Sequence, residues 1–125
     1  YMGLYSFTQQ KRLLKAQEYR QIFDQVSCKI SDRHMLILAT DNQFSQSRLG
    51  VIIAKKNIRL AVNRNRIKRL LRESFRHQTQ FPISVDLVVM ARSGINELSN
   101  TELRQLLERQ WQRLIKKLLK MSFQA

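Results

Sequence analysis

The 125-residue sequence is poor in the residues that cross-link, kink or loosen a chain. It has one cysteine (Cys28), one proline (Pro82) and three glycines. A lone cysteine cannot form an internal disulfide, so stability has to come from a hydrophobic core. The 43% content of apolar residues is sufficient for such a core and argues against disorder. No repeat, linker or low-complexity tract divides the chain, which predicts a single domain over residues 1–125.

Long apolar runs are also missing. The run Leu87–Ala91 is far shorter than the roughly 20 residues of a membrane-spanning helix, so we expect no membrane span. The sequence shows no charged and then apolar leader with a small-residue cleavage site. Together with the lone cysteine, this leads us to expect a protein of the reducing cytoplasm.

Acidic residues are scarce: 9 Asp and Glu stand against 23 Lys and Arg, which gives a net charge of +14. Like charges at this density repel one another in a compact state unless a polyanion neutralises them, and nucleic acid is the most common such partner. The scattered acids, the isolated His34 and His77 and the absence of a glycine-rich phosphate loop leave no obvious catalytic or metal-binding set. We therefore expect no catalytic residue and no metal ligand in this chain.

Short apolar segments rich in branched residues have the length and polar flanks of buried strands. They are Lys29–Ser31, Met35–Thr40, Leu49–Ala54 and Val85–Ala91, and the polar stretch Asp41–Ser47 is predicted to be a surface loop. A first helix is predicted over Ala16–Gln25, where Tyr19, Ile22, Phe23 and Val26 share one face. The order of helix, strands, helix, strand and helix predicts an α+β fold.

The last predicted helix has the clearest start. Ser99 and Glu102 form a capping box, in which each side chain can bind a backbone amide of the other residue. Leu98 and Leu103 occupy the hydrophobic staple positions around it. An apolar stripe follows for about five turns: Leu103, Leu106, Leu107, Trp111, Leu114, Ile115 and Leu118. This stripe predicts that the helix packs on the sheet.

Most of the positive charge lies in one segment. Residues 55–76 contain nine Lys or Arg and one acid, so they carry +8 of the +14. On a helix, one face would present Ile67, Leu70, Leu71 and Phe75, and the opposite face Arg64, Asn65, Lys68, Arg69, Arg72 and Arg76, with Arg66 at its rim. Because like charges four residues apart destabilise a helix, we favour a polyanion-binding face over an ordinary solvated one. Arginine forks suit phosphate oxygens, and Asn65 could read a base edge or a 2′-hydroxyl.

A dense, ordered series of residues runs through this part of the chain: Arg48, Leu49, Gly50, Lys55, Lys56, Ala61, Val62, Arg64, Asn65, Arg66, Lys68, Arg69, Arg72 and Glu73. The series resembles the signature of the ribonuclease P protein family. The resemblance extends to Phe7, Thr8, Arg12, Leu13, Tyr19 and Phe23 and to the segment from Asp86 to Arg92, so it covers nearly the whole chain. The stretch between Lys56 and Ala61 has four residues, a length that resembles the gammaproteobacterial variant of the family.

The resemblance implies a compact αβββαβα domain whose four-stranded sheet contains a left-handed βαβ crossover, a fold called ribosomal protein S5 domain 2-like. It implies a protein subunit, one per RNA, that binds the catalytic RNA of ribonuclease P and the 5′ leader of precursor tRNA. The chain would assist the endonucleolytic removal of the leader. Catalysis would belong to the RNA, Mg²⁺ would be required by the ribonucleoprotein, and this chain would hold no cofactor itself.

Two sets of site residues follow. The family's arginine-asparagine-arginine motif falls on Arg64, Asn65 and Arg66, and we expect the catalytic RNA to contact Arg59, Arg64, Asn65, Arg66, Lys68, Arg69, Arg72 and Arg76. The expected leader contacts are Tyr19, Phe23, Lys55, Lys56 and Arg92, although Tyr19 and Phe23 fit core packing equally well. Two other hypotheses remain: a structural ribosomal-type RNA-binding protein without a role in tRNA processing, and a protein-only nuclease.

Overall fold

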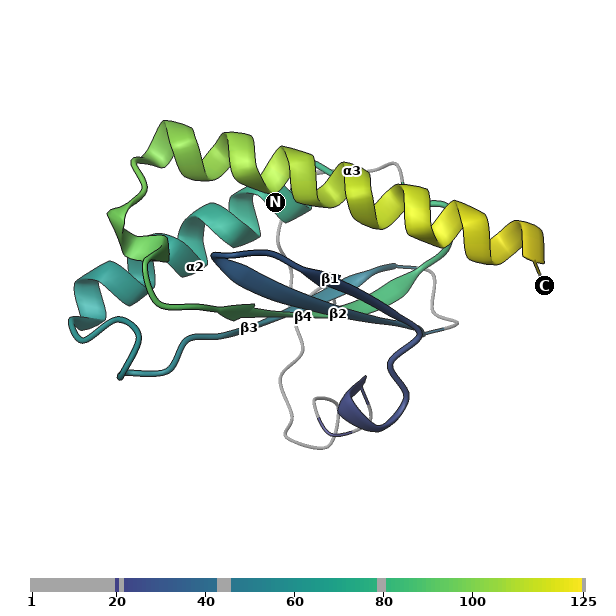
Figure 1. The fold of residues 1–125 in the computed structure, drawn as a ribbon, viewed down its shortest axis with the longest axis horizontal. Coiled ribbons are helices and arrows are strands. Elements are labelled where there is room, and N and C mark those ends of the chain that lie inside the picture. Colours follow the sequence, from purple (N-terminus) through teal and green to yellow (C-terminus); the bar gives the residue numbers. More distant parts are fainter. Residues whose placement is uncertain (1–19, 21, 43–45, 79–80, 125) are drawn as a thin grey trace, which may run out of the picture.

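The apolar segments pair into one four-stranded sheet. The computed structural model describes residues 20, 22–42, 46–78 and 81–124. Its strands are β1 (Cys28–Ser31), β2 (Met35–Asp41), β3 (Arg48–Ile52) and β4 (Val85–Ala91), in the spatial order β1-β2-β4-β3 (Figure 1). β2 pairs antiparallel with β1 and β4, whereas β3 pairs parallel with β4. The four predicted strands are confirmed with small shifts: β1 and β3 each begin one residue earlier, β3 ends two residues earlier, and β2 includes Asp41, which was predicted to be in a loop and pairs with Val85.

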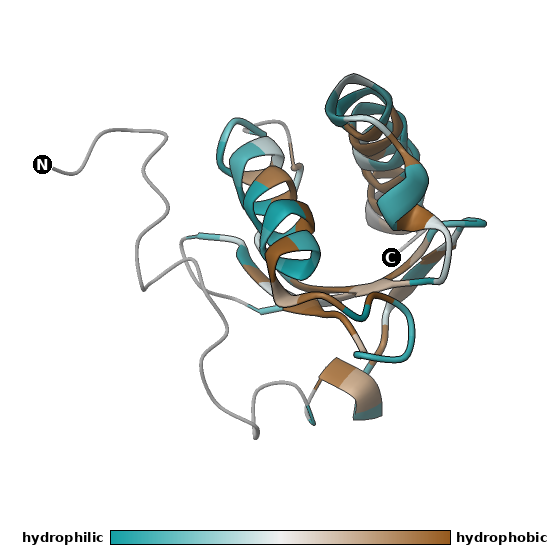
Figure 2. Ribbon diagram, turned by 90° about the vertical axis from the view of Figure 1, so that its left-hand side faces the viewer, coloured by the Kyte–Doolittle hydropathy of each residue, from teal (hydrophilic) through white to brown (hydrophobic). Residues whose placement is uncertain are grey.

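Two long helices cover one face of this sheet. α2 (Ala61–Arg76) and α3 (Asn100–Gln124) lie side by side above it, and the short 3-10 helix η2 (Ile95–Glu97) leads from β4 towards α3 (Figures 1 and 2). The buried residues of α2 are the predicted Ile67, Leu70, Leu71 and Phe75, and all seven residues of the predicted α3 stripe are buried as well. Both stripes meet alternate strand positions in the main core.

The connection from β3 through α2 to β4 sets the position of α2. It joins two neighbouring parallel strands, and α2 lies on the same side of the sheet as α3. In Figures 1 and 2 this path turns left-handed, as the resemblance implied, whereas about 98% of such crossovers are right-handed. Because α2 follows β3, it starts at the end of the sheet where the parallel strands β3 and β4 finish.

The opposite face of the sheet carries a smaller cluster. Residues 22–24 are helical, and Ile22 packs with Leu38 and Val88. Partly buried Leu36, Ile52 and Met90 surround this contact. The first predicted helix is thus confirmed at residues 20 and 22–24, whereas Gln25, its predicted last residue, is in a turn; residues 16–19 and 21 lie outside the described residues.

Candidate nucleic-acid interface

The outer side of α2 carries the cations that the sequence placed there. Asn65 and Arg69 are exposed, and Lys68 and Arg72 are half-buried beside them. The first turn of α2 contains no acidic residue. Glu73 is the only acid in the helix, and a hydrogen bond from Arg76 is the main cause that lowers its pKa. This side of α2 is therefore a nearly continuous cationic surface.

Two arginines near the start of α2 bind oxygens of the protein itself. Arg64 Nη1 donates to the carbonyl oxygens of Ile58 at 2.9 Å and Arg59 at 2.8 Å, so its side chain turns back to the preceding loop. The Arg66 guanidinium donates to Asn100 Oδ1 at 2.6 Å and to the Leu98 carbonyl oxygen at 3.1 Å. Arg66 thereby ties α2 to the start of α3. A helical wheel could not reveal these roles, because it contains no information on acceptors outside the helix.

Basic residues that follow β3 and β4 lie at the same end of the sheet, where α2 begins. Asn57 Nδ2 donates to the Ala91 carbonyl oxygen at 3.1 Å and so joins the turn at residues 55–57 to the end of β4. Lys55 and Lys56, on this turn, are exposed. Arg92 directly follows β4, and its Nη1 donates to a backbone carbonyl oxygen in the β1–β2 turn at 2.6 Å. The three cations predicted to contact the leader are therefore at one edge of the sheet.

The predicted aromatic contacts have different outcomes. Phe23 is 43% exposed, although its neighbour Ile22 is buried on the sheet. The Phe23 ring is therefore accessible to solvent rather than enclosed in the core. Tyr19 lies outside the described residues.

A largely buried ion pair lies on the open face of the sheet, the face that α2 and α3 do not cover, and the sequence did not predict it. Asp86 is 6% exposed and accepts two hydrogen bonds from Arg48, at 2.8 and 2.6 Å. Asn42 Nδ2 donates to the same carboxylate at 2.8 Å. The signal in the sequence was a charged residue inside the otherwise apolar strand β4. The bidentate pair links β3 to β4 beside the apolar positions of this face.

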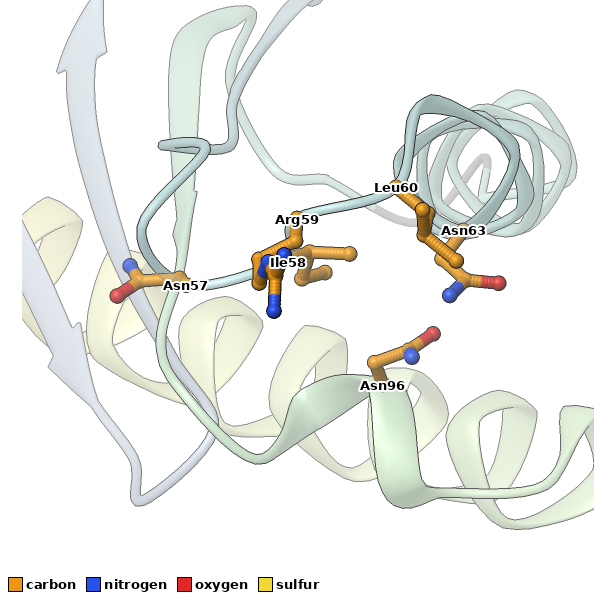
Figure 3. Close-up of a pocket in the computed structure, with 6 residues that line it drawn as sticks. All are labelled: Asn57, Ile58, Arg59, Leu60, Asn63 and Asn96. Atoms are coloured by element: carbon orange, nitrogen blue, oxygen red, sulfur yellow. The ribbon is translucent and has the colours of Figure 1, made fainter.

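A hollow of about 470 Å³ lies between the loop before α2 and η2. It is lined by Asn57, Ile58, Arg59, Leu60, Asn63 and Asn96 (Figure 3). Of these residues, only Arg59 was predicted to bind RNA. Asn57 and Asn63 are close in the sequence, whereas Asn96 in η2 is brought to them only by the tertiary fold.

Other chemistry is limited in the part of the chain that the structure describes. No three His, Cys, Asp or Glu side chains there form a group that could hold a metal ion. No helix among those residues has the length and hydropathy required to cross a membrane. Cys28 is buried, and this burial raises the pKa of its thiol, which disfavours the reactive thiolate.

Comparison with known proteins agrees with this architecture. Residues 7–115 match the sequence profile of the family described as Ribonuclease P. The ribonuclease P protein component of Pseudomonas aeruginosa is 46% identical over 110 residues, which cover 88% of this chain and 82% of that protein. The corresponding protein of Acinetobacter baylyi is 51% identical over 114 residues, or 90% of this chain and 86% of that protein.

Solved structures give the same result. The RNase P protein of Staphylococcus aureus superposes with a TM-score of 0.76 at 25% identity, over 83% of this chain and 94% of that chain. The RNase P protein of Thermotoga maritima gives a TM-score of 0.69 at 26% identity, over 85% and 96%. Because the profile spans most of the sequence and the solved relatives share the fold, this chain belongs to the ribonuclease P protein family.

Proposed function

We propose that this chain binds the catalytic RNA of a ribonuclease P ribonucleoprotein through α2, one protein per RNA, and holds the 5′ leader of precursor tRNA at the open face of the sheet. The observation that carries the proposal is the cationic outer side of α2, which begins at the same edge as Lys55, Lys56 and Arg92. A single surface can thus contact one RNA along the helix and a second RNA strand beside it.

In this proposal, bond cleavage and the Mg²⁺ that it requires belong to the RNA. In the part of the chain that the structure describes, no three His, Cys, Asp or Glu side chains form a group that could hold a metal ion, so the proposal assigns no Mg²⁺ ligand to these residues. The protein instead supplies Lys and Arg charges that neutralise phosphates and reduce the repulsion between two RNA strands. This contribution should be largest where divalent ions are scarce.

Reconstitution tests the proposal directly. Cleavage of a leader-bearing precursor tRNA is measured at low magnesium with the catalytic RNA alone, the protein alone and both together. We expect efficient cleavage only with both. Cleavage by protein rigorously freed of RNA would assign catalysis to the chain, and an unstimulated RNA would refute the role of a subunit.

The RNA-binding side is tested by the salt dependence of affinity for the catalytic RNA. Lys68→Ala/Arg69→Ala should reduce the log-log slope by roughly 1.5, since each neutralised phosphate contributes about 0.7 to 0.9. The matched control is Lys116→Ala/Lys120→Ala, which removes the same charge from exposed positions of α3. Equal effects of the two variants would show that the overall charge, and not α2, determines binding.

Leader contact is tested at Phe23. Phe23→Leu keeps an apolar side chain but removes the flat ring, so binding of a long-leader precursor to the reconstituted enzyme should weaken by about 1 to 3 kcal/mol. A substrate whose leader is trimmed to one or two nucleotides should lose nothing. Equal losses for both substrates, together with a lower melting temperature, would give Phe23 a structural role only.

A further inference from the structure

We propose that the hollow in Figure 3 receives the base of one unpaired nucleotide of a bound RNA. The inference rests on the proposed function, because it requires RNA to dock along α2. It adds a recognition role for Asn57, Asn63 and Asn96, which lie outside the cationic side of the helix.

The size and lining of the hollow suit a planar ligand with polar edges. Its volume of about 470 Å³ is within the roughly 300 to 1,000 Å³ typical of small-molecule sites. Ile58 is only 3% exposed, whereas Leu60 is 61% exposed, so one apolar side chain is fixed and the other faces solvent. Leu60 therefore offers apolar surface to the face of a base, Ile58 anchors the loop in the main core, and the asparagines offer polar groups to the edge of the base.

The hollow is held in shape by hydrogen bonds behind its lining. Arg64 binds the carbonyl oxygens of both Ile58 and Arg59, which fixes the loop on one side. Arg66 Nη2 binds the carbonyl oxygen of Asn96 at 3.1 Å and its Oδ1 at 3.3 Å, which fixes the other side. A ligand would therefore enter a largely preformed site and would not need to order the loop first.

Two groups of the lining are available to a ligand. The Asn63 carboxamide has no side-chain hydrogen bond to any described residue, and Figure 3 shows it facing Asn96 across the opening. A carboxamide offers one acceptor oxygen and two N–H donors, and it pairs with the N6/N7 edge of adenine through two bonds. The Arg59 guanidinium likewise has no partner among the described residues and suits the phosphate of the same nucleotide.

An RNA-borne nucleotide fits this hollow better than a free one. The lining contains one cation and no acid, and the hollow is open to solvent at the start of the cationic helix α2. An open site of this kind holds a free mononucleotide weakly, but attachment to an RNA already bound along α2 raises the effective concentration of the base to the millimolar range. The nucleotide could belong to the catalytic RNA or to precursor tRNA, and separate arms of the experiment distinguish these sources.

The first experiment is an NMR titration of the full chain with adenosine 5′-monophosphate. The side-chain amide signals of Asn63 and Asn96 should shift saturably, and Asn63→Leu should abolish the shift at Asn96. Gln105→Leu, at an exposed position of α3, is the matched control and should leave the titration unchanged. Equal shifts with inorganic phosphate, or no shifts with the nucleotide, would overturn the proposal.

The second experiment uses the reconstituted ribonucleoprotein. Asn63→Leu should weaken either catalytic-RNA binding or precursor-tRNA binding about tenfold, as expected for a lost bidentate base contact, without changing the salt slope. The arm that responds identifies the source of the base. Wild-type affinity of Asn63→Leu in both arms would overturn this inference. The proposed function would still stand if the wild-type protein stimulated cleavage by the catalytic RNA at low magnesium. Failure of the wild-type protein to stimulate its RNA would instead refute the proposed function.

Discussion

The two helices that cover the sheet begin close together but are stabilised differently. At the start of α3, the Ser99 and Glu102 side chains bind each other's backbone amides at 3.1 and 2.9 Å. At the start of α2, Leu60 occupies the N-cap position, forms no side-chain cap bond and is followed by no acid in the first turn. A capping side chain is worth about 1 kcal/mol, so α2 lacks a local stabilisation that α3 has.

Long-range contacts take the place of local capping in α2. Arg66 joins it to the residues around the start of α3, and Arg64 joins it to the loop before it. The first turn of α2, at the positive end of the helix dipole, contains no carboxylate, which would repel RNA. The comparison shows that α3, which is not part of the proposed RNA surface, begins with a side-chain cap. The helix α2, whose outer side is the proposed RNA surface, begins without one.

The largest expected effect comes from removing the link between the two helix starts. Arg66→Ala should lower the free energy of unfolding by about 2 kcal/mol, because charged hydrogen bonds contribute roughly 1.5 to 3 kcal/mol and this side chain is half-buried. Arg66→Lys should restore little, since an ammonium lacks the planar fork that reaches several acceptors. The control is Arg69→Ala, an exposed position of the same helix. If the denaturant unfolding curves of wild type and Arg66→Ala superposed, Arg66 would have no structural role.

The features that depend on residues close together in the sequence could be predicted. The buried faces of α2 and α3, the capping box and the strand segments follow from periodicity and local chemistry, and all are confirmed. The bonds of Arg66 could not be predicted in this way, because its acceptors lie 30 to 34 residues further along the chain. The left-handed crossover came only from the resemblance. The asparagine-lined hollow was missed for the same reason as the Arg66 bonds, since η2 and the loop before α2 are far apart in the sequence and meet only in the fold.

A second prediction gives α2 the cap that α3 already has. Leu60→Asp should raise the free energy of unfolding by about 1 kcal/mol, because the lost leucine is 61% exposed and a carboxylate can bind the first-turn amides. The same carboxylate should weaken binding of the catalytic RNA. Leu60→Ser separates the two effects, since it provides a cap without charge. If Leu60→Asp bound RNA as tightly as Leu60→Ser, the uncapped start of α2 would have no connection with RNA.

A third prediction removes the cap of α3. Ser99→Ala should lower the free energy of unfolding by about 1 kcal/mol, because the amide of Glu102 loses its acceptor. Affinity for the catalytic RNA, compared at a temperature where both proteins are folded, should not change. A loss of affinity similar to that of Lys68→Ala/Arg69→Ala would contradict the separation of folding and binding between the two helices.

The smallest expected effect is a pH dependence at the same cap. The hydrogen bond from the Ser99 backbone amide lowers the pKa of Glu102 below its ordinary value of 4.5. A carboxylate whose pKa is lowered in the folded state stabilises the fold at pH values above that ordinary value, and this stabilisation is lost as the pH falls through the lower folded value. Glu102→Gln should therefore lose less stability than wild type in denaturant titrations as the pH is lowered from neutral to below 4.5. Glu73→Gln is the matched control on α2, where Arg76 lowers the pKa of Glu73 in the same direction without a cap being involved. If the capping box contributes, Ser99→Ala alone should already reduce the acid sensitivity, because the Ser99 side chain also lowers the pKa of Glu102, and it should add nothing in the Glu102→Gln background, whereas Glu73→Gln should add its own small effect in either background. Unchanged acid sensitivity in Ser99→Ala would instead show that Glu102 titrates independently of the Ser99 side chain.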